Sequence, residues 1–356
     1  MGHVWLVDAA FQRGDLAAVE HEINQIEHFA AARQHALAQW HVTRLRATQA
    51  ALIGDLDEAL AQNEAARAIA ERVVTEATGG LYFAFLAQIA MLRGTMTADE
   101  AAAMLRVLGA VRDVALARIF IPITHALRGD KQAARATFEE FRHMPSELQI
   151  GPRWAAVLHH IGIVATMVDD AETAGRVYGI LGSLEPSFLT DGSGAVFCAG
   201  ASPRASGDLA LATGRVAEAI EHYRLAIEMN ARIGARPFVA LSRLGLARAL
   251  LKRGEHTDIP DVRKLAGEAA AEFRRLDMPG PLATADTVLR DSRETSPLSR
   301  RESEVADLIG QALSNKQIAQ RLVLSERTVE SHVRSILGKL GYTTRTEIAT
   351  WNVRSQ

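Results

Sequence analysis

The residues that could support catalysis are scattered along the chain. No His-Glu-x-x-His motif occurs, and the adjacent His159 and His160 would diverge on a helix, where they are poorly placed to share a metal ion. His21, His28 and His35 are seven residues apart, a spacing that could put them on one helix face, but we interpret them as structural or solvated histidines. No pattern pairs two carboxylates in a pocket. We therefore expect no enzyme activity, no metal site and no cofactor.

An amphipathic helix with polar side chains on its exposed face is expected near the C-terminal end of the chain. Apolar residues recur there at i, i+4, i+7, i+8 and i+11, which is the pattern of one buried helix face. They are Val329, Val333, Ile336, Leu337 and Leu340. The side of this helix that stays exposed carries guanidinium, carboxylate and hydroxyl groups. These belong to Arg327, Glu330, Ser331 and Arg334.

Four helices must position these groups, and their N-terminal caps can be found in the sequence. Ser299-Arg-Arg-Glu302 is a capping box, and Ser314, Ser325 and Thr344 begin the next three helices. The residues expected to face inward from the first, second and fourth helices are Val305, Leu308, Ile309, Ile318, Ala319, Leu322, Ile348 and Trp351. The second and third helices are separated only by the turn from Leu322 to Ser325. Such a short turn suits the crossed geometry of a helix-turn-helix.

The motifs LSxRExEV, LSNKQIA, LSERTVESHV and KLG followed by TRTE occur here in order. The segment that contains them resembles the LuxR-type DNA-binding domain along its full length. The resemblance implies that double-stranded DNA is a partner and that the third helix enters the major groove. It also implies phosphate contacts from Ser314, Lys316, Ser325, Thr328 and Lys339, and base contacts from Glu330, Ser331 and Arg334. A helix pair that merely ends the preceding array is the alternative.

Two further expectations come from this resemblance. Some branches of the family carry Lys at the position of Glu330, and a carboxylate there cannot hold a phosphate but can accept a hydrogen bond from cytosine N4. The operator sequence is therefore open. The fourth helix mediates pairing in the family, so Ile348 and Trp351, which are three residues apart on one face, are candidate homodimer contacts. They could instead close the core of their own domain.

Short turn signals recur at nearly equal intervals along the preceding part of the chain. Their central positions are 14, 54, 94, 129, 169, 214 and 254. Each signal ends one helical pattern and precedes another, which indicates a solenoid of helix pairs, with an ordinary helical bundle as the alternative. In the clearest unit, residues 214–230, Gly214, Ala219, Tyr223 and Ala226 resemble the tetratricopeptide pattern. The glycine-rich stretch 190–208 interrupts the array and is expected to be a long loop or a closely packed helix, with a ligand-facing loop as the alternative.

Composition supports this organisation. Hydrophobic residues make up 48% of the 356 residues and aromatic residues 5%, which favours helices packed through small side chains. The formal net charge is -2, whereas the segment 298–356 carries nine Lys or Arg and six Asp or Glu, so basic charge is concentrated mildly at this end. A single cysteine, Cys198, rules out a disulfide within the chain, and the apolar run 81–92 is too short to span a membrane. The N-terminus lacks the pattern of a signal peptide, so a cytoplasmic location is expected.

Together these features predict an all-α protein with a tetratricopeptide-like helical-repeat domain over 1–280, a linker over 281–297 and a LuxR-type helix-turn-helix domain over 298–356. The repeats, mainly residues 190–290, are similar to the helical region of the large ATP-binding LuxR regulators. Those carry an ATPase module, and no P-loop occurs here, so a shortened member and a fragment both remain open.

The expected function is bacterial transcription regulation by a homodimer on DNA, with no membrane partner. RNA polymerase, and a small-molecule or protein effector of the repeats, are further candidate partners. The alternative is a helical-repeat adaptor that binds partner proteins, with subordinate DNA binding.

Overall fold

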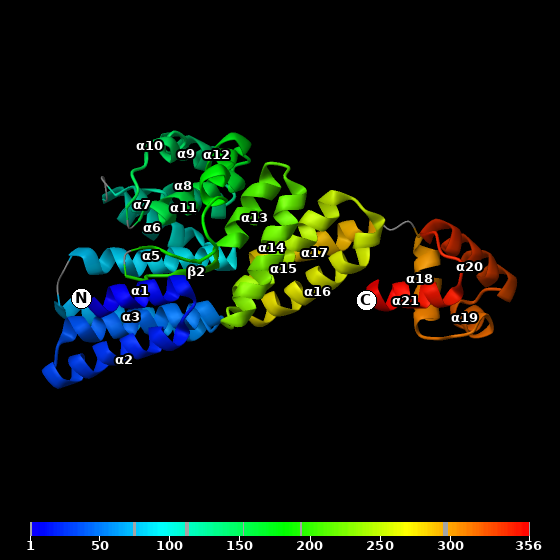
Figure 1. The fold of residues 1–356 in the computed structure, drawn as a ribbon, viewed down its shortest axis with the longest axis horizontal. Coiled ribbons are helices and arrows are strands. Elements are labelled where there is room, and N and C mark those ends of the chain that lie inside the picture. The colour runs from blue at the N-terminus through cyan, green and yellow to red at the C-terminus, as the bar shows by residue number, and fades with distance from the viewer. Residues whose placement is uncertain are drawn as a thin grey trace.

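The computed structural model of the protein describes residues 2–73, 76–110, 114–151, 153–192, 194–294 and 298–355. In these residues helices predominate, and a short two-stranded sheet joins them (Figure 1). The expectation of an all-α chain with four helices near its C-terminal end is confirmed. In the described ranges no helix combines the length and the apolar character that a membrane crossing requires.

Each of the N-terminal helices packs beside the helix that precedes it, and short turns join the first four. They are α1 (Gly2–Arg13), α2 (Leu16–Arg33), α3 (Ala36–Ile53), α4 (Leu56–Val73) and α5 (Glu76–Arg93). Many of their apolar side chains, including Phe11, Ile23 and Leu45, are buried in one hydrophobic cluster that continues into the later helices. Helices α1 to α5 are therefore not a separate unit.

The middle of the chain packs around a second hydrophobic cluster, whose aromatic members are Phe120, Phe138 and Phe141. Its elements are α6 (Ala98–Ala110), α7 (Ala115–Arg118), α8 (Phe120–Leu127), α9 (Lys131–Phe138), the 3-10 turn η1 (Glu139–Phe141), α10 (Met144–Glu147), α11 (Trp154–Met167) and α12 (Ala171–Leu181). His159 and His160 lie on α11 and are both buried, and burial lowers the pKa of His160 to about 4. Both histidines belong to the interior of this unit.

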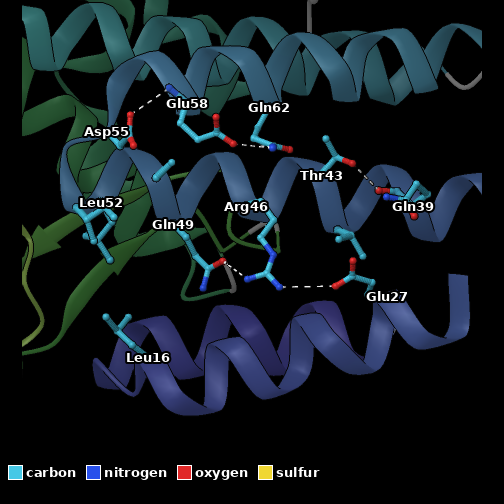
Figure 2. Close-up of a pocket in the computed structure, with 13 residues that line it drawn as sticks. Leu16, Glu27, Gln39, Thr43, Arg46, Gln49, Leu52, Asp55, Glu58 and Gln62 are labelled. Carbon is cyan, nitrogen blue, oxygen red and sulfur yellow. Dashed lines mark hydrogen bonds and ion pairs between the residues drawn. The ribbon is translucent and has the colours of Figure 1, made fainter. Parts of the chain in front are cut away.

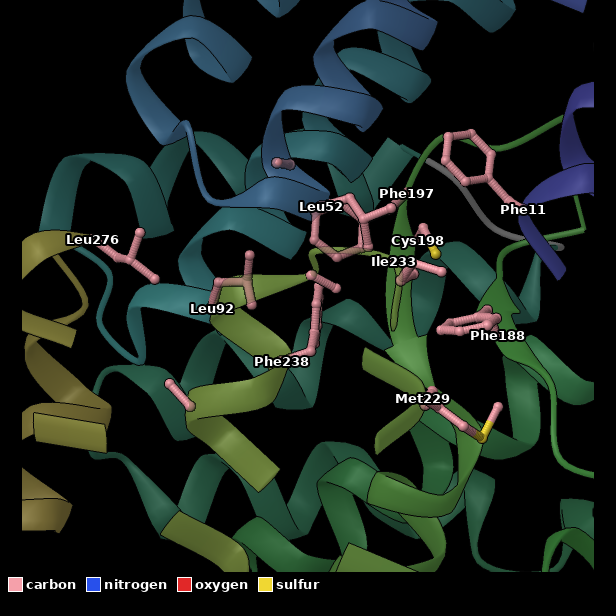
Figure 3. Close-up of a cluster of buried hydrophobic side chains, with 14 of the residues drawn as sticks. Phe11, Leu52, Leu92, Phe188, Phe197, Cys198, Met229, Ile233, Phe238 and Leu276 are labelled. Atoms are coloured by element: carbon pink, nitrogen blue, oxygen red, sulfur yellow. The ribbon is translucent and has the colours of Figure 1, made fainter. Parts of the chain in front are cut away.

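The glycine-rich stretch forms neither of its two expected structures throughout. It contains β2 (Cys198–Ala201), which pairs antiparallel with β1 (Phe188–Thr190) and then leads into a helix. Figure 3 shows Phe188, Phe197 and Cys198 of this hairpin gathered with Phe238 in the main hydrophobic cluster. Gly200 has a φ of 73°, and a Cβ there would lie 2.5 Å from the Phe238 ring. The glycine thus permits a strand, rather than a second helix, to approach the core.

The next helices form a continuous run in which each packs on its predecessor. They are α13 (Ser202–Ala212), α14 (Val216–Arg232), α15 (Arg236–Arg253), the 3-10 turn η2 (His256–Asp258), α16 (Ile259–Arg275) and α17 (Pro279–Glu294). Tyr223 of α14 is fully buried between α13 and α15, where Cβ atoms on Gly207 and Gly245 would lie 2.9 and 2.2 Å from its ring. This packing is compatible with the tetratricopeptide-like unit, and the solenoid itself stays a prediction.

The seven recurring turn signals are confirmed as helix boundaries. The central residue of each has a positive φ, and only Asp169, with a φ of 60°, is not a glycine. Because left-handed backbone stops a helix and costs glycine little, these positions fix where the chain reverses. After four of the turns an aspartate side chain accepts a hydrogen bond from the backbone of the next helix. These caps are Asp15, Asp55, Asp130 and Asp170.

The linker expected over 281–297 is helical as far as it is described. Residues 281–294 belong to α17, whose Ala285 and Val288 are buried against the main cluster. Pro279 at the beginning of this helix lacks an amide hydrogen that would be unsatisfied there in any case, so proline signals a helix start as well as a loop. Residues 295–297 lie outside the described ranges, and the domain boundaries stay a prediction.

Candidate nucleic-acid interface

The C-terminal unit contains α18 (Arg300–Gly310), α19 (Asn315–Leu322), α20 (Glu326–Leu340) and α21 (Arg345–Ser355), at the far end of the molecule in Figure 1. Capping boxes at Ser299 and Ser314 are both closed, and the Ser325 hydroxyl accepts a hydrogen bond of 3.1 Å from the Thr328 amide. The Thr344 hydroxyl accepts from the Glu347 amide at 3.3 Å. The four helix starts predicted from the sequence are confirmed.

The turn between α19 and α20 determines the angle at which these two helices cross. Val323 ends α19 with a φ of 54°, and its amide donates to the carbonyl of Ala319. A positive φ is uncommon for a β-branched residue, so packing on both sides must hold this turn in place. Ile318 and Val329, on either side of it, are fully buried. The turn therefore fixes the direction of α20 relative to α19.

The side chains predicted to read bases lie on the surface of the unit. Arg327, Glu330, Ser331 and Arg334 are all exposed on one side of α20, and these four residues are named the α20 stripe. None of them forms a hydrogen bond or ion pair with another described residue. Because these groups have no such role in the described fold, they are available to a ligand that approaches α20.

The predicted phosphate contacts fall into two groups. Lys316 is exposed on the first turn of α19 and has no bonded partner among the described residues. Ser314 and Ser325 are also exposed, but each hydroxyl already caps a helix. The Thr328 hydroxyl is within 2.7 Å of the Ser325 hydroxyl. Lys316 is therefore the predicted phosphate contact that is most free to move toward a ligand.

Lys339 is engaged inside the unit. Its Nζ donates a hydrogen bond of 2.7 Å to Glu302 of α18, whose side chain is only 6% exposed. The Ser335 hydroxyl and the Ser299 amide donate to the same carboxylate at 2.6 and 2.7 Å. Burial opposes ionisation, but these hydrogen bonds lower the pKa of Glu302 from 4.5 to about 2. Glu302 thus joins α18 to α20, a role that its place in a capping box did not reveal.

Ile348 and Trp351 lie in the hydrophobic core of the C-terminal unit and are 0% and 8% exposed. Of the two alternatives left open by the sequence, this position corresponds to closing the domain's own core. The surface of α21 is instead formed by residues such as Thr346 and Thr350. Helix α21 also packs against α16 of the preceding run. Pairing of two copies through α21 stays a prediction.

Arg345 is a structural residue that the sequence did not single out. Its guanidinium donates to the Asn315 side chain at 2.6 Å and to the carbonyl of Leu313 at 2.7 Å. These bonds hold the first turn of α19 against the start of α21. A basic residue directly after the Thr344 cap was the available signal, but only tertiary contacts assign it a partner.

The helices of the N-terminal part enclose a hollow of about 640 Å³ between α2, α3 and α4 (Figure 2). Arg46 points into it and is bonded to Glu20, Asn24 and Gln49. Glu27 lies 3.7 Å from the same guanidinium. Because the Arg46 cation is already neutralised, the hollow offers little to an anionic ligand.

Comparison with known proteins shows which family the C-terminal unit resembles. Residues 296–352 match the family model described as "Bacterial regulatory proteins, luxR family". The chain is 43% identical over 61 residues to the transcriptional regulatory protein LnrK of Bacillus subtilis, which is 17% of this chain and 28% of that protein. It is 36% identical over 107 residues to the nitrate/nitrite response regulator protein NarL of Escherichia coli, which is 29% of this chain and 48% of that protein.

A putative HTH-type transcriptional regulator of Mycobacterium tuberculosis is 39% identical over 59 residues, which is 17% of this chain and 7% of that protein. The chain thus spans less than half the length of each of these relatives. The matched family model, the two closed capping boxes and the short turn between α19 and α20 coincide in the same residues. Residues 296–352 are therefore a helix-turn-helix domain of the luxR family of bacterial regulatory proteins.

Proposed function

We propose that this protein is a DNA-binding transcription regulator. The observation that carries the proposal is the α20 stripe: four exposed groups without any bond to a described residue. A recognition helix contacts base edges with side chains that its own fold does not use. The names of the similar proteins, which are transcriptional and response regulators, support the same function.

In this proposal α20 enters the major groove and the start of α19 lies against the DNA backbone. Arg334 and Glu330 then meet base edges, where a guanidinium suits guanine and a carboxylate suits cytosine N4. Lys316 meets a phosphate and supplies affinity that does not depend on base sequence. Lys339 contributes mainly by fixing α20 to α18 through Glu302.

The helical repeats in this proposal sense an effector or recruit a partner protein and thereby control the domain. One domain reads only a few base pairs, so genomic specificity calls for two copies on a two-fold operator, with half-sites about one helical turn apart. RNA polymerase is the partner through which such a complex would change transcription.

A second function, that of a helical-repeat adaptor, is favoured by the hollows and grooves of the helical part. In that case partner proteins bind the repeats, and DNA binding is subordinate. The two functions differ in what the cell loses when the C-terminal domain is removed. An adaptor keeps its role without residues 298–356, whereas a regulator loses it.

The deciding experiment selects bound sequences from a random DNA library with the full chain. A chain that ends at Glu294 is the matched control, because α17 packs on the main cluster and must be kept. We expect the full chain to enrich one sequence with salt-dependent affinity and the shortened chain to enrich none. Equal enrichment by both chains, or none by the full chain, would contradict the proposal.

A further inference from the structure

A groove of about 880 Å³ runs between two parts of the helical region. Helices α13, α15 and α17 form one wall, and the ends of α5, α8 and α11 form the other. Apolar side chains line much of it, among them Met91, Leu127, Leu241 and Leu251. A volume of this size and a lining that combines apolar side chains with polar groups are found in small-molecule binding sites.

Helix α15 gives this groove its polarity. Leu241, Leu244, Arg248 and Lys252 line the groove at intervals of three and four residues, so they form one stripe along the helix. Both leucines come first along the helix, and both cations follow. The wall formed by α15 is therefore apolar toward its N-terminal end, and toward its C-terminal end it carries two cations beside Leu251.

The acidic residues of the groove do not neutralise these two cations. Asp169 pairs with Lys131 at 2.9 Å, and Asp170 pairs with Arg142 at 2.8 Å. Asp208 accepts 2.7 Å hydrogen bonds from Arg204 and from the Tyr223 hydroxyl, and Asp291 lies 3.8 Å from Arg290.

Arg248, in contrast, is exposed and forms no hydrogen bond or ion pair with any described residue. Lys252 donates to the carbonyl of Leu211 at 3.0 Å. Within the described ranges, neither cation of this end of the groove is paired with a carboxylate.

Buried side chains pack closely behind the part of the groove that contains Arg248. The Tyr223 ring is clamped between Gly207 and Gly245, and its hydroxyl holds Asp208, which in turn holds Arg204. Burial raises the pKa of the Tyr223 hydroxyl well above its usual value, whereas the nearby charges of Arg248 and Arg204 lower it. Asp208 joins Arg204 to this hydroxyl, and Arg248 lines the same groove three residues after Gly245. A preformed site of this kind loses little entropy when it binds a ligand.

We propose that this groove binds a small carboxylate with an apolar body. The guanidinium of Arg248 and the ammonium of Lys252 hold the carboxylate, and the leucines of α15 contact the body. A planar guanidinium matches the two oxygens of a carboxylate, which an alcohol or an amide of the same shape cannot replace. The inference rests on the proposed function, since it assigns the effector class of the repeats.

The test measures binding to the full chain by isothermal titration calorimetry, without DNA. The probes are octanoate, decanoate and 4-phenylbutyrate, each compared with the alcohol of the same skeleton. The variants are Arg248→Gln and, as a matched control on the same helix, Arg243→Gln. Arg243 pairs with Glu268 at 3.3 Å and does not line the groove. Far-UV circular dichroism of each variant establishes that the helices are retained.

We expect at least one carboxylate to bind, its alcohol to bind about tenfold more weakly, and Arg248→Gln to remove that difference. Arg243→Gln is expected to bind like the unaltered chain. Absence of binding by all three carboxylates, equal binding of acid and alcohol, or equal behaviour of the two variants would overturn the proposal. DNA selection is measured in a separate experiment. A groove that binds no carboxylate therefore does not contradict the proposed DNA binding, and a failure of DNA selection does not contradict the proposed carboxylate site.

Discussion

Lys339 of α20 and Glu302 of α18 are joined by a hydrogen bond of 2.7 Å. The resemblance to LuxR-type domains implied a phosphate contact for Lys339, and the capping pattern implied a purely local role for Glu302. Their contact gives both residues a structural role, because the Glu302 carboxylate also accepts hydrogen bonds from the Ser299 amide and the Ser335 hydroxyl. Helix α20 is thereby fixed to α18, the first helix of the domain, through one buried carboxylate.

Replacing Glu302 tests this connection. Glu302→Gln should lower the free energy of unfolding of the C-terminal domain by roughly 2 kcal/mol, a value that allows for solvent screening at the half-exposed Lys339. The pKa of Glu302 is lowered from 4.5 to about 2 in the folded domain. The stabilisation is therefore complete above pH 4.5 and is lost as the pH falls through about 2.

Hydrogen exchange of α18 and α20 amides in the full chain, measured between pH 3 and pH 7, reports this free energy. Glu304→Gln is the control, because Glu304 forms its ion pair with Arg301 of the same helix, α18. An equal effect of both substitutions, or a Glu302 effect that persists unchanged at the lowest pH, would contradict the role of Glu302.

Base contacts and phosphate contacts can be separated by substitution. Arg334→Ala should cost roughly 1–3 kcal/mol on the selected site and little on random DNA, because a base contact is lost. Lys316→Ala should weaken binding to both DNAs alike and flatten the salt dependence by about one ion. Titrations at several salt concentrations measure both effects. If the two variants behave identically on the two DNAs, the assignment of contacts is wrong.

Substitutions at Trp351 and Thr350 test whether each side chain of α21 belongs to the domain core or to a dimer contact. Trp351→Ala should cost about 3 kcal/mol of stability, because the indole is buried in the domain core, and should weaken binding to a half-site and a palindrome equally. Thr350→Arg changes the exposed side of α21 without entering the core. If two copies of the protein pair through α21, Thr350→Arg should abolish cooperative binding to the palindrome and leave half-site affinity unchanged.

Gel-shift titrations and thermal unfolding of both variants provide these measurements. A Trp351→Ala variant of normal stability that loses only cooperativity would show that this side chain acts at the dimer contact. Unchanged cooperativity in Thr350→Arg would place the pairing surface outside this part of α21.

Alanine substitutions at two helix glycines should change the stability of the chain in opposite directions. A Cβ at Gly245 would lie 2.2 Å from the Tyr223 ring, so Gly245→Ala should destabilise the chain by about 1–3 kcal/mol. Apart from the adjacent residues and the backbone of α16 itself, no atom lies within 4 Å of a Cβ at Gly267, so Gly267→Ala should stabilise the chain by about 0.4–1 kcal/mol. Urea unfolding followed by circular dichroism measures both. Equal effects of the two substitutions would show that Tyr223 is not clamped as described.

The sequence determined the local features of this protein. Helix starts at Ser299, Ser314 and Ser325, and chain reversals at positions such as Gly54 and Gly214, could be predicted. Caps and left-handed turns depend on residues three or four positions apart, and these are adjacent in any fold. The same holds for the α20 stripe, because helical periodicity alone separates its exposed face from its buried face.

Tertiary structure decided which distant groups meet. Spacing could not show that Lys339 binds Glu302, nor that Ile348 and Trp351 face their own core. It also could not show that Arg44 is buried and donates a 2.8 Å hydrogen bond to the carbonyl of Gly194, which lies between β1 and β2. Such contacts join residues tens of positions apart, and a charged side chain enters the interior only where the fold provides acceptors for it. The sequence therefore determines the elements, and the packing of those elements determines which of their polar groups remain free to bind.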